Sequence, residues 1–300
     1  TIDSSALPLP ERKTLSVQLA LRQLELTPLI ETFSPGVAAT VDLNLNVELA
    51  LKGYQAWISQ SGSVQLSDVS LALDESRAEL GSLSWQGESS QQLNLQEGAE
   101  PLVKLALNGL LEAGQVELVQ GDQAARLSTL SLKTDLSVTP ETLTMQGSTS
   151  LALVELGLSQ PGQNLELGAL DVNIPDLSSG PQTSVDLSAT DLRATRSSAE
   201  TLSLARLNAD LVLGQQSGQP IWQPVSVAGD ISLNQLDASA EGAEVALQQL
   251  QAKLSSSSLN AVEKLAVDAG FEGMTALQAD TRMILGSGSV ALNYDAATEL

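Results

Sequence analysis

The sequence has no cysteine and no histidine, and aromatic residues make up only 2% of its 300 residues. Without thiols and imidazoles the chain has no disulfides, no thiol nucleophiles, no imidazole bases and few of the usual ligands of zinc, haem or iron–sulfur clusters. Aromatic rings normally fill cores and ligand pockets, so the apolar surface here is built from Leu, Val, Ala and Ile. A chain without cysteine also fits an oxidising compartment.

Basic residues are scarce as well. The chain carries 14 Lys+Arg against 36 Asp+Glu, a formal net charge of −22. Such a chain repels a phosphate backbone, so we predict no nucleic-acid partner. No run of 18 apolar residues is present, and no basic and apolar leader follows Thr1, so we expect a processed or excised segment whose anchor lies elsewhere.

Catalytic motifs are missing too. The segment Gly-Ser-Gly-Ser at 286–289 does not match the Gly-x-Ser-x-Gly sequence of a nucleophile elbow. Gly109 and Gly114 have the spacing of a phosphate loop, but Gln-Val follows them instead of the required Lys-Ser/Thr. No cluster of Asp at alternate positions forms a calcium loop. Acidic pairs such as Asp74-Glu75 keep an acid-dependent glycosidase as the least favoured alternative. We predict that the protein is not an enzyme and binds no cofactor or metal.

The dominant pattern is alternation of apolar and polar residues. Val41 to Leu51 is the clearest run, and shorter ones begin at Leu15, Val69, Val185 and Val225. Because successive side chains of a strand point to opposite faces, each run has one aliphatic and one polar face. Turn-forming residues separate the runs at 61–63, 121–122, 161–162, 178–181 and 214–218. The pattern predicts an all-β protein with a long, repetitive, curled antiparallel sheet.

A unit Leu-x-x-Leu-x-apolar recurs about every 42 residues, each time after a short strand and a polar turn. Its period and its lack of a regular Asn or Cys exclude a leucine-rich repeat. We interpret it as a hairpin whose return strand breaks its alternation once, as a bulge does. The five units are Leu80-Leu83-Trp85, Leu127-Leu130-Leu132, Leu167-Leu170-Val172, Leu204-Leu207-Ala209 and Leu247-Leu250-Ala252.

The domain organisation is simple. Residues 1–14, with Pro8 and Pro10, are predicted to be a linker, and residues 15–300 form one elongated β-groove segment of a longer chain. Residues 244–285 are rich in helix formers, so minor helical segments remain an alternative to continued sheet there, as does one helical turn at 29–33. Some 15–20 strands at ~4.8 Å each predict a length of about 70–95 Å.

An aliphatic strand face must be covered. A closed core normally mixes aromatic with aliphatic side chains to reach native packing density, whereas this lining is smooth and poor in rings. Such a surface suits fluid acyl chains, which need contact area and no directional bonds. With few basic residues to hold a phosphate, lipid head groups would stay in water and selectivity would be low.

In texture the chain from Leu15 to Leu254 resembles the AsmA-like envelope proteins, the YdbH/TamB/YhdP type of bridge-like lipid transfer family. The resemblance lies in the short Leu/Ser/Asp-rich strands, in segments such as Gly81 to Gly87, and in the segment Leu7 to Arg12 that precedes the first alternating run. It implies a periplasmic β-groove, anchored in the inner membrane outside this segment. It also implies phospholipid cargo, transfer between inner and outer membranes, and an outer-membrane lipoprotein or protein as a further partner. No catalytic residue carries over.

Two functions therefore stay open. The first is a lipid-conducting groove, and the second is a structural or adhesive β-solenoid of the cell envelope with a closed aliphatic core. The candidate lipid-lining residues are Val41, Leu43, Leu45, Val47, Leu49, Leu71, Leu83, Leu130, Leu132, Leu151, Leu170, Val185 and Leu207.

Overall fold

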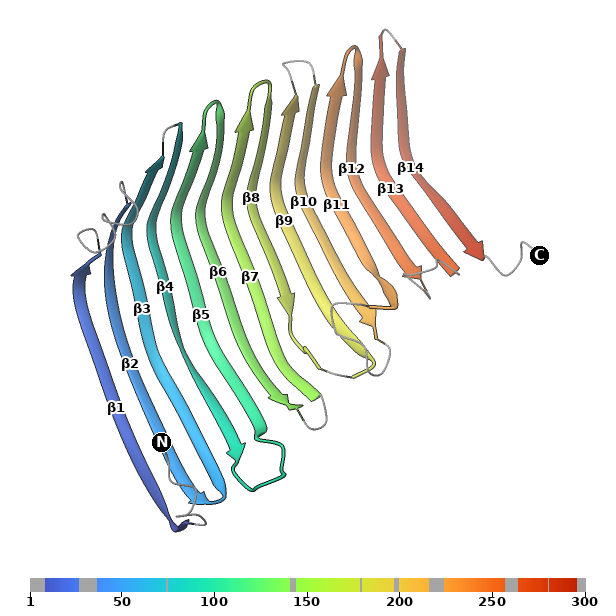
Figure 1. Cartoon of the computed structure of the whole chain (residues 1–300). Helices are drawn as coiled ribbons and strands as arrows, with labels where there is room; N and C mark the ends of the chain where they lie inside the picture. Colours follow the sequence, from blue (N-terminus) through green and yellow to red (C-terminus); the bar gives the residue numbers. More distant parts are fainter. Residues whose placement is uncertain are drawn as a thin grey trace.

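The protein folds into one open antiparallel β-sheet whose 14 strands follow one another in chain order (Figure 1). The computed structural model describes residues 9–26, 37–73, 75–140, 144–178, 180–196, 200–215, 224–256, 264–279 and 281–295. The two edge strands are not paired with each other, so the sheet is curled but not closed. The predicted all-β, curled antiparallel sheet is confirmed.

The strands are long, from 12 to 19 residues. Their bounds are β1 Leu9–Glu25, β2 Val37–Gly53, β3 Gln55–Leu73, β4 Ser76–Asn94, β5 Leu102–Gln120, β6 Gln123–Thr139, β7 Thr144–Gln160, β8 Gln163–Ile174, β9 Gln182–Arg196, β10 Glu200–Gly214, β11 Ser226–Ala240, β12 Ala243–Ser256, β13 Lys264–Gln278 and β14 Thr281–Asp295.

Residues 244–285 resolve one alternative that the sequence left open. They lie in β12, β13 and the start of β14, and the described residues contain no helix. Helix propensity is a weak preference, and here the apolar rows of the sheet continue through these strands and override it. The helical turn expected at 29–33 lies outside the described residues.

Two sequence-based boundaries were wrong. Strand β1 begins at Leu9, so residues 9–14 belong to the sheet and not to a linker: Leu9 pairs with Gly53, and Lys13 with Leu51. Edge strands tolerate proline because one side of the strand needs no backbone donor. The turn expected at 61–63 lies inside β3, where Gly62 faces Leu45 and Gly87 on the neighbouring strands.

The number of strands was also overestimated. The described residues form 14 strands rather than 15–20, because runs that were interpreted as separate strands form the two halves of one long, bent strand. Thirteen inter-strand steps of ~4.8 Å span about 62 Å, somewhat less than predicted.

The sheet is a single layer. Each strand packs chiefly against the strands that flank it in the chain, and no large side chain among the described residues is fully buried. The accessible surface is 19277 Å², whereas a compact protein of this mass exposes about 12,000 Å². The molecule therefore has two open faces and no closed core among its described residues.

Every strand bends at the same level of the sheet, in its upper part in Figure 1. One residue of each odd-numbered strand has φ between 50° and 63° there, in the left-handed region. Among the described residues of the even-numbered strands only Gly53, at the end of β2 and away from the bend, has a φ in this range. We call the resulting row across β3 to β14 the bend line. It consists of Asp68, Gly81, Gln115, Ser128, Glu155, Gly168, Asp191, Ala205, Gln235, Gln248, Gly273 and Gly286.

The bend line explains the Leu-x-x-Leu-x-apolar repeat. In the pair β4–β5, both strands interrupt their alternation between the cross-strand pairs Ser82–Gly114 and Leu80–Val116. Gly81 faces Gln115 at this point, and the register does not shift. The expected break of alternation is confirmed, but it is not a bulge with two residues against one. Both strands change phase together, and the left-handed residue sits on the outgoing strand rather than on the return strand.

Candidate apolar groove

One face of the sheet carries three apolar rows that run from strand to strand. Each row collects one position of the repeated motif, because the register places equivalent residues of successive hairpins side by side. Row 1 lies next to the bend line on the side of the upper turns, and rows 2 and 3 lie on its other side. None of the three rows contains a charged residue, so they form an uninterrupted aliphatic surface.

The members of the rows follow from the register of the paired strands. Row 1 is Val69, Leu80, Val116, Leu127, Leu156 and Leu167, then Leu192, Leu204, Leu236, Leu247, Met274 and Leu285. Row 2 is Val41, Leu66, Leu83, Ala113, Leu130, Leu153, Leu170, Ala189, Leu207, Leu233, Leu250 and Phe271. Row 3 is Leu21, Leu43, Val64, Trp85, Leu111, Leu132, Leu151, Val172, Leu187, Ala209, Ile231, Ala252, Ala269 and Val290.

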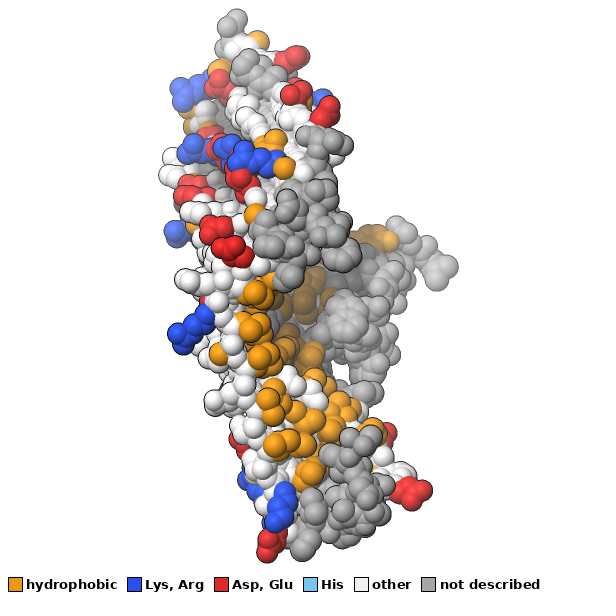
Figure 2. All heavy atoms as spheres, turned by 60° about the vertical axis from the view of Figure 1, so that its left-hand side comes forward, with side chains coloured by type: hydrophobic (Ala, Val, Ile, Leu, Met, Phe, Trp, Pro, Cys, Tyr) orange, Lys and Arg blue, Asp and Glu red, His pale blue; other side chains and the backbone are white. Residues whose placement is uncertain are grey.

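The apolar face is hollowed. Figure 2 shows the hydrophobic side chains gathered in a band inside the curl, with the charged side chains to one side of it. Leu204 of row 1 is only 8% exposed although the sheet is a single layer. Most other members of the rows are half-buried, because neighbours in the same row cover their flanks and leave their tips exposed.

The thirteen predicted lining residues are all half-buried, and most of them share two rows. Five stand in row 2 and three in row 3. Four others lie outside the three rows. Leu45 pairs with Gly62, and Val185 pairs with Leu211. Val47 and Leu49 lie further along β2. The row 2 members are Val41, Leu83, Leu130, Leu170 and Leu207, and the row 3 members are Leu43, Leu132 and Leu151.

Leu71 lies apart from the others, on the far side of the bend line. It belongs to a fourth row, built of leucine and alanine, along the edge with the upper turns. This row lines a hollow of about 1030 Å³. We call it the Leu/Ala row; its members are Leu71, Ala78, Leu118, Ala125, Leu158, Leu165, Ala194 and Leu202.

Trp85 was expected to be a core residue, and it lies half-buried on the apolar face instead. A Cβ atom added to Gly87 would lie 3.0 Å from its Cζ2 atom, and one added to Gly109 would lie 3.2 Å from its Nε1 atom. The indole therefore occupies the space left by two glycines. It makes the floor of the groove continuous where side chains are missing.

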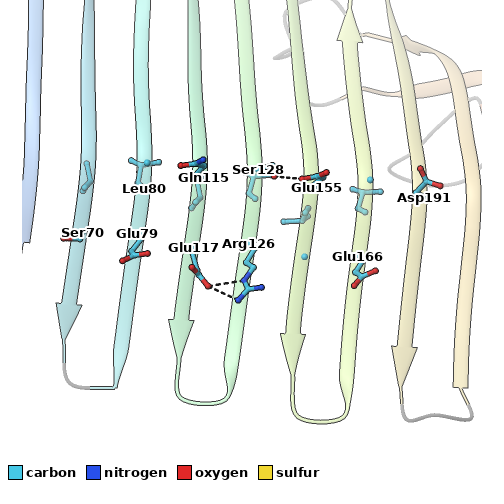
Figure 3. A pocket seen from close by; sticks show the side chains of 18 of the residues that line it. Ser70, Glu79, Leu80, Gln115, Glu117, Arg126, Ser128, Glu155, Glu166 and Asp191 are labelled. Atoms are coloured by element: carbon cyan, nitrogen blue, oxygen red, sulfur yellow. Dashed lines mark hydrogen bonds and ion pairs between the residues drawn. The ribbon is translucent and has the colours of Figure 1, made fainter.

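A trough of about 960 Å³ follows the bend line (Figure 3). Its lining combines charged and polar side chains with row 1 residues such as Leu80 and Leu127. Arg126 donates to the Oε1 atom of Glu117 from Nε at 3.1 Å, and Ser128 Oγ donates to Oε2 of Glu155 at 2.6 Å. Six acidic residues and two arginines line the trough, so it repels anions.

The charged side chains near the trough are exposed to water, which weakens the electrostatic interactions between them. The hydrogen bond from Arg77 to Glu79, with the attraction of that carboxylate, raises the pKa of the exposed guanidinium. No group of three acidic side chains among the described residues could hold a metal ion. Within the described part of the chain, no helix is long and apolar enough to cross a bilayer.

The predicted lining residues cover only a minority of the groove: they include no member of row 1, and the bend line was missed altogether. Leu153 and Leu233 of row 2 and Leu187 of row 3 could have been included by extending the alternation of their own strands. The left-handed positions also leave a signal, because apolar residues change from odd to even numbers in β5 between Ala113 and Val116. This change of parity indicates a shared bend only when the register shows that neighbouring strands change at the same level.

Comparison with protein-family models, with curated proteins and with solved structures finds no match for this chain.

Proposed function

We propose that the apolar face binds lipid acyl chains and that the sheet conducts phospholipids between the inner and outer membranes. The observation that carries this proposal is the set of uncharged apolar rows, of which row 3 runs from β1 to β14 and which no described part of the chain covers. Large exposed apolar patches mark interaction surfaces on soluble proteins. A face of this length requires a ligand that is itself long and apolar.

The energetics favour acyl chains. Burial of one methylene contributes ~0.8 kcal/mol, so a chain of 16 carbons gains on the order of 10 kcal/mol when it moves from water to the rows. The rows offer no hydrogen bond to a particular site. A lipid can therefore slide from one strand to the next without losing a directional contact.

Head groups stay outside the groove in this proposal. The chain has only 14 basic residues against 36 acidic ones, and rows 1 to 3 contain none of either. A phosphate therefore finds no cationic pocket along the apolar face, and it remains in water at the rim. We expect little discrimination between phospholipid classes.

The cellular location and the partners in this proposal come from the resemblance to AsmA-like proteins. It places the groove in the periplasm, with an inner-membrane anchor outside this segment and an outer-membrane lipoprotein or protein at the receiving end. The absence of cysteine fits an oxidising compartment.

A solenoid stalk is the competing function, and it requires a closed aliphatic core. The described residues make one layer with two open faces. No observation therefore favours the stalk over the groove.

Photo-cross-linking tests the groove without disturbing it. A benzophenone side chain at Leu130 points to row 2, whereas one at Ser131 points to the polar face. In cells we expect a phospholipid adduct at position 130 and none at 131, detected by mass spectrometry. Equal labelling at both positions, or none at either, would contradict the proposal.

A matched pair of charge substitutions tests transport. Leu151→Asp places a carboxylate in row 3, whereas Ser150→Asp places it on the other face, between Lys133 and Asn173. We expect Leu151→Asp to abolish lipid co-purification and Ser150→Asp to preserve it. Circular dichroism checks that both variants keep their sheet, and retention of lipid by a folded Leu151→Asp variant would argue against the groove.

A further inference from the structure

The apolar face is bordered by polar amides on the side of the upper turns. On each strand from β4 to β9, the residue two positions nearer the turn than the Leu/Ala row lies on the same face. These residues form one further row, which we call the glutamine rim; its members are Ser76, Gln120, Gln123, Gln160, Gln163 and Arg196. They line the same hollow of about 1030 Å³ as the Leu/Ala row. The hollow therefore joins an apolar floor to a polar border.

The rim is rich in hydrogen-bond donors. A glutamine side chain carries two N–H donors and one carbonyl acceptor. Gln120 and Gln123 pair across one hairpin, and in the next hairpin Nε2 of Gln160 donates to Oε1 of Gln163 at 2.6 Å. All four glutamines are exposed. The bond between Gln160 and Gln163 uses one donor of that pair, and the remaining donors suit the oxygens of a phosphate or an ester.

The rim is also electrically neutral on a strongly acidic molecule. Arg196 is its charged member, and its Nε atom lies 3.8 Å from Oε2 of Glu200 on the adjacent strand. Alternation places the nearby acids Glu79 and Glu117 on the opposite face. The net charge of −22 repels an anionic phosphate from most of the surface. At the rim, by contrast, a phosphate meets a border without net charge.

The other end of the central strands lacks such a border. In β5, β6 and β7 the same face ends near the lower turns in an apolar row, Leu105, Val138 and Met145. An amphiphile on this face therefore finds amide donors at the upper end of these strands and an apolar row at the lower end. The two ends of the groove are chemically different, so a bound lipid has a preferred direction.

We propose that the glutamine rim holds the phosphate groups of glycerophospholipids. Each lipid then lies with its head at the upper turns and its acyl chains on the Leu/Ala row and the apolar rows below it. This orientation rests on the proposed function, because it requires lipid on the apolar face. It adds to that function the direction in which the cargo lies.

Neutral amides suit a cargo of mixed phospholipids. The phosphodiester is the polar group that these lipids share, so a row of carboxamides binds it without selecting among head groups. The turns at 121–122 and 161–162 have only two residues (Figure 1), and they leave the outer part of each head open to water. Because the rim passes from strand to strand, a lipid keeps its orientation as it moves along the sheet.

Fluorescence quenching by nitroxide lipids tests the orientation. The chain has no cysteine, so a fluorophore is attached to one of three variants of the full chain, Ala125→Cys beside the rim, Leu130→Cys in row 2 or Val138→Cys at the lower end. All three positions lie on the same face of β6. Each labelled chain is loaded from phosphatidylcholine vesicles that carry a nitroxide on the choline head or at the end of an acyl chain. We expect the head nitroxide to reduce fluorescence at 125 but not at 138, and the tail nitroxide to reduce it at 130.

The outcomes separate this orientation from the groove itself. Head quenching at 138, or equal head quenching at 125 and 138, would overturn the orientation, while tail quenching at 130 would still support a lipid groove. Absence of tail quenching at 130 would refute the groove and, with it, the role of the rim.

A matched pair of isosteric variants tests the rim residues. Gln123→Glu adds a carboxylate to the rim, whereas Gln146→Glu adds one to the opposite face of β7, where Gln146 pairs with Ser137. Both glutamines are exposed. We expect Gln123→Glu to weaken binding of phosphatidylglycerol by about two- to five-fold and to leave binding of diacylglycerol, which has no phosphate, unchanged. Gln146→Glu should change neither.

Three results of this comparison would contradict the proposal. Equal effects of the two variants would show that the rim has no special role. An equal loss of both lipids in Gln123→Glu would show that the rim does not contact phosphate. Displacement of phosphatidylglycerol by inorganic phosphate would assign the rim to the free anion rather than to a lipid head.

Discussion

Six polar residues and one glycine set the shape of this sheet. Gln23, Asp68, Gln115, Glu155, Asp191, Gln235 and Gly273 each adopt a left-handed backbone in an odd-numbered strand. This conformation costs roughly 1–2 kcal/mol for a residue with a Cβ atom. Local hydrogen bonds offset part of that cost: the Gln23 backbone N–H donates to Oδ1 of Asp42 at 2.9 Å, and Glu155 accepts from Ser128.

Replacing Gln235 by glycine should therefore stabilise the protein. Relief of roughly 1–2 kcal/mol of backbone strain exceeds the roughly 0.5–1 kcal/mol that glycine costs in a strand. We expect the free energy of unfolding, measured in urea, to rise by up to about 1 kcal/mol.

The neighbouring residue is the control for this substitution. Asn234 is in the same strand without a left-handed backbone, so Asn234→Gly should lower the free energy of unfolding by about 0.5–1 kcal/mol. If both glycine variants lose stability equally, the left-handed conformation at 235 is not a source of strain.

At the scale of the strand, two glycines of the bend line lie close against left-handed residues. A Cβ atom added to Gly168 of β8 would lie 2.9 Å from the Cβ atom of Asp191, and one added to Gly81 would lie 2.6 Å from Oε1 of Gln115. Both distances are shorter than an ordinary van der Waals contact. At these two positions the bend therefore needs a residue without a side chain.

We predict that Gly168→Ala lowers the free energy of unfolding by about 1–3 kcal/mol, as overpacking does. Gly157→Ala is the matched control, because it lies on the adjacent strand with nothing within 4 Å of the added Cβ atom. That variant should be neutral or slightly stabilising, since alanine restricts the unfolded chain. Equal losses in the two variants would mean that the contact with Asp191 is unimportant.

At the scale of the whole molecule, the acidic balance opposes the fold. The net charge is −22, and the six ion pairs among the described residues all involve solvent-exposed side chains. Exposed ion pairs contribute little to stability, whereas the excess of carboxylates repels over the whole sheet. Repulsion between the acids therefore dominates the electrostatics of the molecule.

Salt should consequently stabilise the protein. Raising NaCl from ~10 mM to ~500 mM shortens the Debye length several-fold and screens this repulsion, so the thermal unfolding midpoint should rise. Circular dichroism at the two salt concentrations measures it. A fall in the midpoint would show that the ion pairs, and not the excess acids, control the response.

Local pattern was enough to predict part of this molecule. The alternation of Val41 to Leu51 and the hairpin turns at 121–122 and 161–162 are encoded by neighbouring residues, because strand period and turn geometry depend on a few consecutive side chains. The spacing of the Leu-x-x-Leu motif also predicted that alternation breaks once in each return strand. The all-β class followed from these signals, as did eight of the residues that line rows 2 and 3.

Other features were decided only when strands came together. Pairing with β2 drew residues 9–14 into the sheet, and pairing with β2 and β4 kept Gly62 inside β3 rather than in a turn. Alternation determines which side chains share a face along one strand, but register between strands determines which of them form a row. The bend line and the continuous groove arise from that register, because each joins residues far apart in the chain.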